Sequence, residues 1–173
     1  MKQIVLPSAA LRTAFYKMAL DYRESGDRRY YRDVVADGFD FEAYVTLLHR
    51  HALGISLEEG LVPYTTYWLM DEGKGTIFGV SRLRHKLNKV SQKEGGHIGY
   101  DVPPSWRGEG NATELLRQTL LKARAMGLFR VLLTCDEENR ASARVIEKNG
   151  GVLENRIVSD YTKKIVCRYW INC

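Results

Sequence analysis

The stretch that most constrains the fold of this chain is GYDVPPSWRGEGNA, from Gly99 to Ala112. The residues around its start predict a strand from His97 to Val102, and Pro103-Pro104 ends that strand because proline has no backbone N–H to donate. Gly108 and Gly110 then stand directly before a segment of helical periodicity. A helix that opens on glycines exposes N–H groups at the positive end of its dipole, where a phosphate binds well. The stretch therefore predicts a strand, a turn and a helix with an anion-binding loop between them.

The helix after this loop carries a full apolar stripe. From Ala112 to Met126 apolar residues recur at intervals of three and four, and Gly127 provides a C-terminal cap. The short apolar run from Leu128 to Cys135 predicts a buried strand, which would join the strand before Pro103 in a β-α-β unit. A second helix is expected from Asn139 to Asn149.

Periodicity and turn residues divide the rest of the chain into short elements. β-Branched and aromatic residues on both sides of Asp71–Gly75 predict a β-hairpin, and the polar segment 85–96 predicts a long connection. The other expected elements are a strand over 3–6, a helix capped by Ser8 and running to about Arg23, a loop over 24–40, a helix over 41–52 and a terminal strand pair with its turn near Ser159-Asp160. The order β-α-α-β-β-β-α-β-α-β-β predicts a single mixed-sheet α/β domain over residues 1–173.

The composition excludes several classes of protein. A hydrophobic content of 45% with 27% charged residues argues against disorder, and no stretch approaches the roughly 18 apolar residues of a membrane span. The N-terminus lacks the apolar core of a signal peptide, so we expect a cytoplasmic protein. The cysteines form no C-x-x-C pair, which argues against a disulfide framework and a structural zinc site. The net charge of +5 attracts anionic ligands only mildly.

Glycine-containing loops bind phosphate in several kinds of protein, and the residues here argue against two of them. A Walker loop requires Gly-Lys-Ser/Thr, which this chain does not contain. A dinucleotide-binding fingerprint would place its third glycine where Thr113 stands. On these residues alone, a structural helix entry with a surface Arg107 remains an alternative to an anion site.

A wider pattern around this loop is similar to that of a known family. Val102-x-Pro104 followed by Arg107-x-x-Gly110-x-Ala112 resembles the pyrophosphate-binding motif of the GCN5-related N-acetyltransferase (GNAT) family. A second segment, Asn139 with Ala141, Ser142 and the sequence 147–150, resembles the family's next helix. The resemblance as a whole covers most of Ile77 to Leu153. It implies a mixed, mostly antiparallel sheet of six to seven strands with a central splayed parallel pair, flanked by about four helices.

The resemblance also implies a cosubstrate and a way to bind it. Family members hold acetyl-CoA between two splayed strands, here matched to His97–Val102 and Leu128–Cys135, and no metal is expected. The backbone of the first strand would pair with the pantetheine, and the glycine loop would receive the pyrophosphate. The implied cofactor-binding residues are Tyr100, Asp101, Val102, Arg107, Gly108, Glu109, Gly110, Asn111, Ala112, Asn139 and Ser142. Asn139 is equally suited to capping the helix that it precedes.

The implied reaction is direct attack of an amine on the thioester, which requires a base, an oxyanion donor and a proton for the thiolate. His97 is the candidate base, since similar acetyltransferases often carry Glu there and an imidazole titrates near neutrality; a strand-end surface histidine is the alternative. Many members place a proton-donating Tyr seven residues after the Asn, where this chain has Ile146. Tyr161 is a weak candidate acid, Tyr100 and Cys135 are other substitutes, and solvent could also protonate the thiolate.

The acceptor is expected to be an amine-bearing small molecule or protein. In the family it is held by segments that match 23–39 and 155–163, and neither segment carries a diagnostic motif. Two other functions stay open: a non-catalytic acyl-CoA-binding sensor, suggested by Ile146, and an RNA-binding module that would use the loop Arg28–Arg32. Nucleic acid is nevertheless disfavoured as a partner, a membrane is not expected, and a homodimer is compatible with the resemblance.

Overall fold

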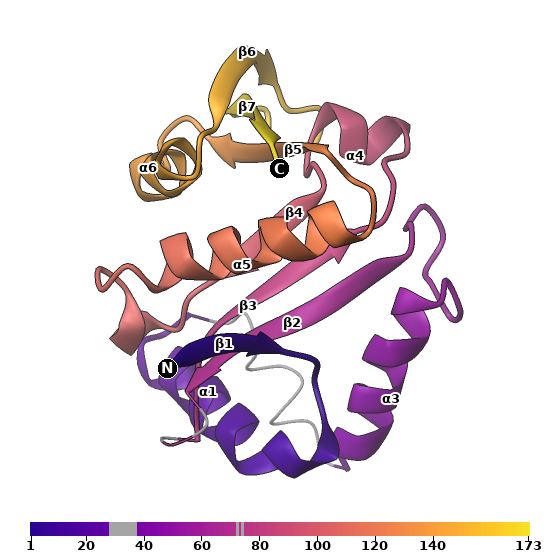
Figure 1. The fold of residues 1–173 in the computed structure, drawn as a ribbon, viewed down its shortest axis with the longest axis vertical. Coiled ribbons are helices and arrows are strands. Elements are labelled where there is room, and N and C mark those ends of the chain that lie inside the picture. The colour runs from indigo at the N-terminus through magenta and orange to yellow at the C-terminus, as the bar shows by residue number, and fades with distance from the viewer. Residues whose placement is uncertain (28–37, 72, 74) are drawn as a thin grey trace.

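The computed structural model describes residues 1–27, 38–71, 73 and 75–173 of the chain. Figure 1 shows the arrangement of its elements. In chain order they are β1 (Lys2–Val5), η1 (Ala9–Leu11), α1 (Arg12–Glu24), α3 (Phe41–Ala52), β2 (Tyr64–Asp71), β3 (Thr76–Arg84), α4 (Lys89–Lys93), β4 (Ile98–Asp101), η2 (Pro104–Trp106), α5 (Asn111–Ala125), β5 (Arg130–Asp136), α6 (Arg140–Lys148), β6 (Val152–Val158) and β7 (Ile165–Asn172).

The strands form two antiparallel sheets. The larger has the order β1-β2-β3-β4, and the smaller has the order β5-β7-β6. In Figure 1 β4 and β5 begin on the same side of the molecule and then diverge, with β5 continuing across the top and β4 passing behind α5. The boundary between the two sheets therefore lies between β4 and β5.

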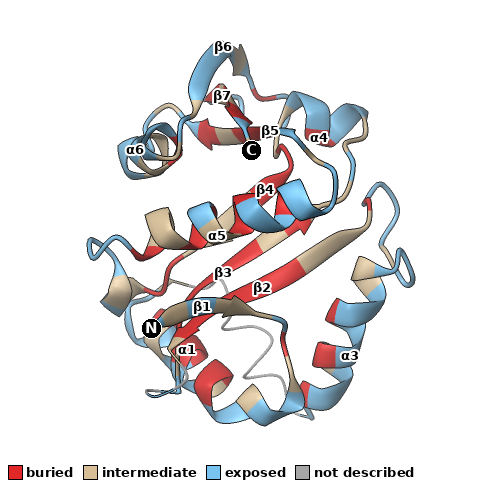
Figure 2. Ribbon diagram, viewed as in Figure 1, coloured by how far each residue is buried: buried red, intermediate tan, exposed pale blue. Residues whose placement is uncertain are grey.

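Helices cover both faces of the larger sheet, and strand alternation determines which side chains meet them. Trp68 and Met70 of β2 pack into a core with α1 and α3. Tyr67 and Leu69, which point to the opposite face, belong to the clusters that contain residues of α5. Figure 2 shows buried residues in β2, β3 and the helix surfaces that face them, and also in β5 and β7 of the smaller sheet. The sheet is consequently a middle layer between α5 on one side and the α1–α3 pair on the other.

The expected fold class is confirmed, with two differences in its details. The mixed sheet is divided at its splayed centre, since the ladder between β4 and β5 does not extend along the strands. The connection over 85–96 contains the short helix α4, where Asn88 and Ser91 form a reciprocal capping box. A five-residue polar helix has too little periodicity to be recognised from its sequence.

The start of the first helix also differs from the prediction. The Ser8 side chain makes no capping hydrogen bond, and a 3₁₀ turn over 9–11 precedes the α-helix, which starts at Arg12. The helix over 41–52 is confirmed with the predicted bounds. Its first turn is capped by the Asp40 carboxylate, which accepts from the backbone N–H groups of Glu42 and Ala43.

Candidate functional site

The two sheets touch where β4 begins. The backbone N–H of His97 donates to the Leu132 carbonyl at 2.7 Å, and the Leu132 N–H donates to Nδ1 of the His97 ring at 2.9 Å. Gly96 makes this approach sterically feasible, since a Cβ there would lie 2.3 Å from the Leu132 oxygen. The imidazole thus occupies a place in the strand ladder that a backbone carbonyl would normally take, at the point from which β4 and β5 separate.

His97 is buried, with 7% of its surface exposed. Burial and the nearby positive charge of Arg84 lower the pKa of its imidazole, so the neutral form is favoured. Because Nδ1 accepts a hydrogen bond, the ring proton of the neutral form resides on Nε2. In this arrangement His97 can take a proton from an amine only if its bond to Leu132 breaks.

A cavity of about 490 Å³ lies beyond the contact between the sheets. Its wall is formed by the end of β4, the glycine loop, the first turn of α5 and one face of α6. All the predicted cofactor-binding residues line this cavity except Glu109, and His97 does not line it. The structure therefore brings together residues that are far apart in the sequence.

The glycine loop has the backbone conformation that its sequence indicates. Gly108 and Gly110 have φ angles of +80° and +81°, in the left-handed region that a side chain disfavours. Gly110 is the residue that caps α5, so the helix starts at Asn111 with its first N–H groups directed towards the loop. These donors and the positive end of the helix dipole can hold a phosphate group.

Side-chain hydrogen bonds fix the loop to neighbouring elements. The Arg107 guanidinium donates through Nε to the Val102 carbonyl at 3.0 Å and pairs with Asp27 at 2.9 Å. The buried Asn111 side chain donates to the Trp106 carbonyl at 2.8 Å and accepts from Lys2. Asn111 therefore contributes its backbone, and its side chain holds the turn in place.

The side chain of Tyr100 connects β4 to α6 through a hydrogen bond. The Tyr100 hydroxyl lies 2.7 Å from Oγ of Ser142, and the Ser142 N–H donates to the Asn139 side chain at 3.0 Å. Burial raises the pKa of Tyr100 to about 12, so its hydroxyl keeps its proton at neutral pH. Asn139 thus has the capping role that its position allows, within the wall of the same cavity.

The other proposed proton donors, Tyr161 and Cys135, lie outside the cavity wall. Ile146, at the position of the family's usual proton donor, is an aliphatic residue fully buried in the core. Tyr161 lies in the turn between β6 and β7 with 72% of its surface exposed, away from the cavity wall. Cys135 is buried, and desolvation raises the pKa of its thiol to about 11. Among the described residues, Tyr100 is the phenol that lines the cavity.

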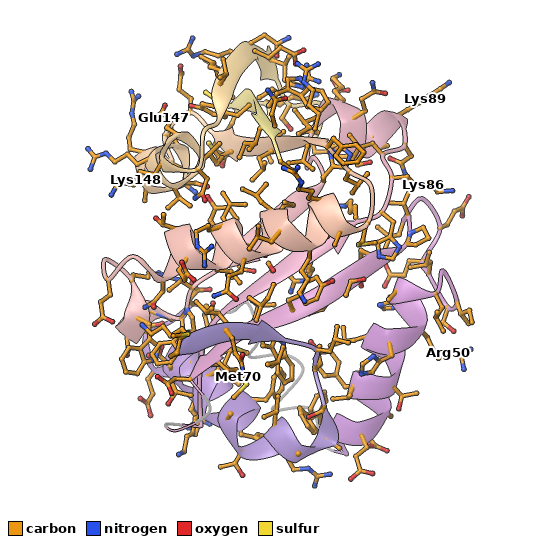
Figure 3. All side chains as sticks on the ribbon, viewed as in Figure 1. Arg50, Met70, Lys86, Lys89, Glu147 and Lys148 are labelled. Atoms are coloured by element: carbon orange, nitrogen blue, oxygen red, sulfur yellow. The ribbon has the colours of Figure 1, made fainter. Side chains whose placement is uncertain are left out.

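Sequence reasoning missed part of the cavity wall. The α6 residues Ala141, Arg144, Val145 and Lys148 line it together with Trp106 and Thr113. Figure 3 shows Lys148 at the exposed end of α6. The four α6 positions recur at intervals of three and four, so the helical spacing could have identified them as one face. Arg144 and Lys148 add positive charge near the start of α5.

The segments expected to hold an acceptor are only partly visible. Most of the segment 23–39, including the Arg28–Arg32 loop, lies outside the described residues. The segment 155–163 covers the end of β6 and the turn that follows it, where the Ser159 hydroxyl accepts from the N–H groups of Tyr161 and Thr162. On the α1–α3 side of the sheet, the Arg82 guanidinium pairs with Asp101 at 3.2 Å.

Comparison with protein families identifies the class to which this fold and site belong. The family model described as the acetyltransferase (GNAT) domain matches residues 22–152, which is most of the chain. The chain therefore belongs to the GNAT acetyltransferase family. A search of curated proteins returned no significant match.

Solved structures share this fold at low sequence identity. RimL, an α-N-protein acetyltransferase for a ribosomal protein, in complex with coenzyme A, has a TM-score of 0.70 and 16% identity, covering 99% of this chain and 93% of that chain. MccE, a microcin self-immunity acetyltransferase in complex with acetyl-CoA and AMP, has a TM-score of 0.67 and 13% identity, and the match covers 99% of this chain and 92% of MccE. Mutant forms of the spermidine/spermine N-acetyltransferase SpeG from Vibrio cholerae have a TM-score of 0.63 and 14% identity, covering 99% and 95%.

Acetyl-CoA is accordingly the cosubstrate that the family and these liganded neighbours indicate. The cavity fits it chemically, because it joins a phosphate-binding helix start to an open strand edge. Within the described ranges, no cluster of side chains could hold a metal ion. In the same ranges, no helix has both the length and the hydrophobicity of a membrane span.

Proposed function

We propose that this protein is an N-acetyltransferase that transfers the acetyl group of acetyl-CoA to a primary amine in a ternary complex. The observation that carries the proposal is the cavity itself, in which the Gly108–Gly110 loop and the start of α5 adjoin the end of β4 and one face of α6. The whole chain would act as one domain. Its free cysteines are consistent with the cytoplasm, where thiols stay reduced.

In the proposed binding mode, each part of acetyl-CoA lies against protein groups of complementary chemistry. The pyrophosphate would accept hydrogen bonds from the N–H groups between Arg107 and Ala112, with Arg144 and Lys148 adding opposite charge. The pantetheine amides would pair with the backbone of Tyr100–Val102 as an added strand. Asn139 and Ser142 would line its path from α6. This mode leaves the thioester near the separation of the two strands.

The reaction itself is an acyl transfer without a covalent enzyme intermediate. The amine nitrogen attacks the thioester carbon, a C–N bond forms, and the C–S bond breaks as coenzyme A leaves as a thiolate. The amine loses one proton, which passes to solvent unless His97 acts as the base, and the thiolate takes one. Tyr100 is the proposed donor of the second proton, because its hydroxyl is protonated and lines the cavity.

His97 enters the proposal as a positioning residue. Its ring accepts the Leu132 N–H and so fixes the point at which β4 and β5 begin to separate. General-base catalysis by His97 is the alternative, and it requires that this hydrogen bond break in each turnover. The two roles differ in what His97→Asn should do, because the Asn amide oxygen can accept the Leu132 N–H but cannot take a proton: the variant should keep its rate in the positioning role and lose it in the base role.

The acceptor is proposed only as a class. Named neighbours act on spermidine or spermine and on a ribosomal protein, so an amine-bearing small molecule and a protein both fit this fold. A homodimer is part of the same proposal, and size measurement in solution will test it.

A direct experiment can test the proposed activity. The purified chain is mixed with acetyl-CoA and, in turn, spermidine, free amino acids and peptides with unblocked N-termini, and thiol release is followed with a chromogenic disulfide. A product heavier by one acetyl group, seen by mass spectrometry, is the expected result. The Tyr100→Phe variant should bind acetyl-CoA normally and turn over more slowly. Acetyl-CoA binding without turnover of any amine would contradict the proposal.

That contrary result would favour a second candidate function, a non-catalytic acyl-CoA sensor. The observation behind it is Ile146, which is fully buried at the position where many family members place their proton donor. A sensor would bind acetyl-CoA with a change in its conformation or partners and would release no thiol. The amine experiment therefore distinguishes the two functions.

A further inference from the structure

A second cavity, of about 310 Å³, lies at the opposite edge of the larger sheet. It is bordered by the chain after β1, by α3, by β2 and by Lys122 of α5. From its geometry we propose that this cavity binds a short extended peptide that ends in a free carboxylate and adds to the edge of β2. The proposal does not depend on acetyl transfer, because the acetyl-CoA cavity involves other residues.

The edge of β2 is bare because β1 stops early. The two strands pair only as far as Val5 opposite Trp68. The same register would place Pro7 opposite Thr66, but proline has no N–H to donate to a neighbouring strand. The Pro7 carbonyl instead accepts a hydrogen bond from Nε2 of His49 at 2.8 Å. Figure 1 shows the chain turning away from the sheet after β1, while β2 continues.

The register also shows which backbone groups of β2 face this bare edge. On the other side of β2, the His85 N–H donates to the Pro63 carbonyl, so the odd-numbered residues from Pro63 to Leu69 bond to β3. The N–H and C=O groups of Thr66 therefore point outward, where another strand would pair with them. An exposed strand edge of this kind is a template for an added peptide.

A buried hydroxyl supplies a second, independent observation. Thr66 lines the cavity with 3% of its surface exposed, and its Oγ1 has no hydrogen-bond partner among the described residues. Leaving a buried hydroxyl unpaired is unfavourable, so such a group usually finds a partner in protein, water or ligand. A polar group of a peptide bound in this cavity can provide one. The hydroxyl and the strand edge thus call for the same chemistry.

The remaining wall defines what kind of peptide fits. Leu6, Pro7, Leu48 and Ala52 form an apolar surface that suits one aliphatic side chain. Lys122 is exposed, and no interaction of its ammonium group is found in the part of the chain that the structure describes. Its charge complements a carboxylate. The volume suits two or three residues, which agrees with the three consecutive β2 residues that line the cavity, Thr65–Tyr67.

The test uses peptides that cannot accept an acetyl group. The full chain, labelled with ¹⁵N, is titrated with N-acetyl-Ala-Leu-Ala carrying a free carboxylate, and with the same peptide as a C-terminal amide. Binding is read from the backbone amide resonance of residue 66, which both the wild type and its variants possess. We expect a saturable shift with the free acid and about threefold weaker binding of the amide, the effect of losing an exposed ion pair.

Two variants localise the binding. Thr66→Val keeps the β-branched shape, removes the unpaired hydroxyl and should bind about fivefold more weakly while unfolding at the same or a higher denaturant concentration. Lys122→Met should bind the free acid and the amide equally, whereas Lys17→Met, which changes an exposed lysine of α1, should behave as the wild type. An unmoved Thr66 resonance at about 10 mM peptide, or equal binding by all variants, overturns the proposal.

Discussion

Replacing His97 by alanine tests the hydrogen bond from which the two sheets diverge. The variant would leave the buried Leu132 N–H without its acceptor at 2.9 Å. An unpaired buried donor costs about 1–3 kcal/mol, and the lost packing of a buried side chain adds to that cost. His97→Asn is the matched control, because the amide oxygen of Asn can accept the same N–H. We therefore expect His97→Ala to be less stable than His97→Asn by about 1–3 kcal/mol at pH 8.

The pH dependence of this difference follows from the sign of the pKa shift. The pKa of the His97 ring is lowered in the folded protein, because burial and the charge of Arg84 disfavour the imidazolium. Its contribution to stability is thus complete above the unfolded pKa of about 6.5 and declines as the pH falls through that value towards the folded pKa. His97→Asn lacks this titration. The pKa of His85 is also lowered, but His85 is common to both proteins, so its effect cancels in the comparison.

The assay is urea unfolding followed by tryptophan fluorescence, with free energies taken by linear extrapolation between pH 5 and pH 8. We expect the wild type to lose stability relative to His97→Asn as the pH falls from about 7 to about 5. Equal stability of the alanine and asparagine variants at pH 8 would refute the role of the hydrogen bond. A difference between wild type and His97→Asn that does not change with pH would refute the account of the ring's charge.

Three further predictions concern the neighbouring residues. Gly96→Ala should destabilise the protein by more than about 2 kcal/mol in urea unfolding, because its Cβ would lie 2.3 Å from a backbone oxygen; wild-type stability would contradict the close approach. Tyr100→Phe should lower kcat about tenfold or more with little change in KM for acetyl-CoA, and an equal kcat would remove Tyr100 as proton donor. Lys148→Met should weaken acetyl-CoA binding in calorimetry about threefold or more, whereas Lys17→Met should not; equal affinities would exclude Lys148 from the phosphate site.

The glycine loop was predictable because its signals are local. The left-handed backbone at Gly108 and Gly110 and the strand end at Pro103-Pro104 are properties of those residues themselves. The same holds for α3, whose cap and apolar spacing lie within its own segment. Local chemistry therefore identified the loop that is proposed to bind phosphate.

The rest of the site depends on contacts between residues distant in sequence. The hydrogen bond between Leu132 and His97 spans 35 residues, and the one between Tyr100 and Ser142 spans 42. No periodicity shows in advance that an imidazole will replace a strand carbonyl or that a phenol will cross to α6. The resemblance therefore suggested His97 as a base. Its position in the fold, which no spacing rule specifies, shows that Nδ1 of the ring already accepts a hydrogen bond.

The most direct test of the central claim is a calorimetric titration of the purified chain with acetyl-CoA, with ATP as the control ligand and Gly110→Trp as the control protein. Gly110 has a φ angle of +81° in the loop proposed to bind pyrophosphate, so a tryptophan there should disturb the loop conformation. The account predicts saturable binding of one acetyl-CoA in the micromolar range, no comparable binding of ATP, and loss of acetyl-CoA binding in the variant with an unchanged circular dichroism spectrum. Absence of acetyl-CoA binding to the wild type, or equal affinity in the variant, would contradict it.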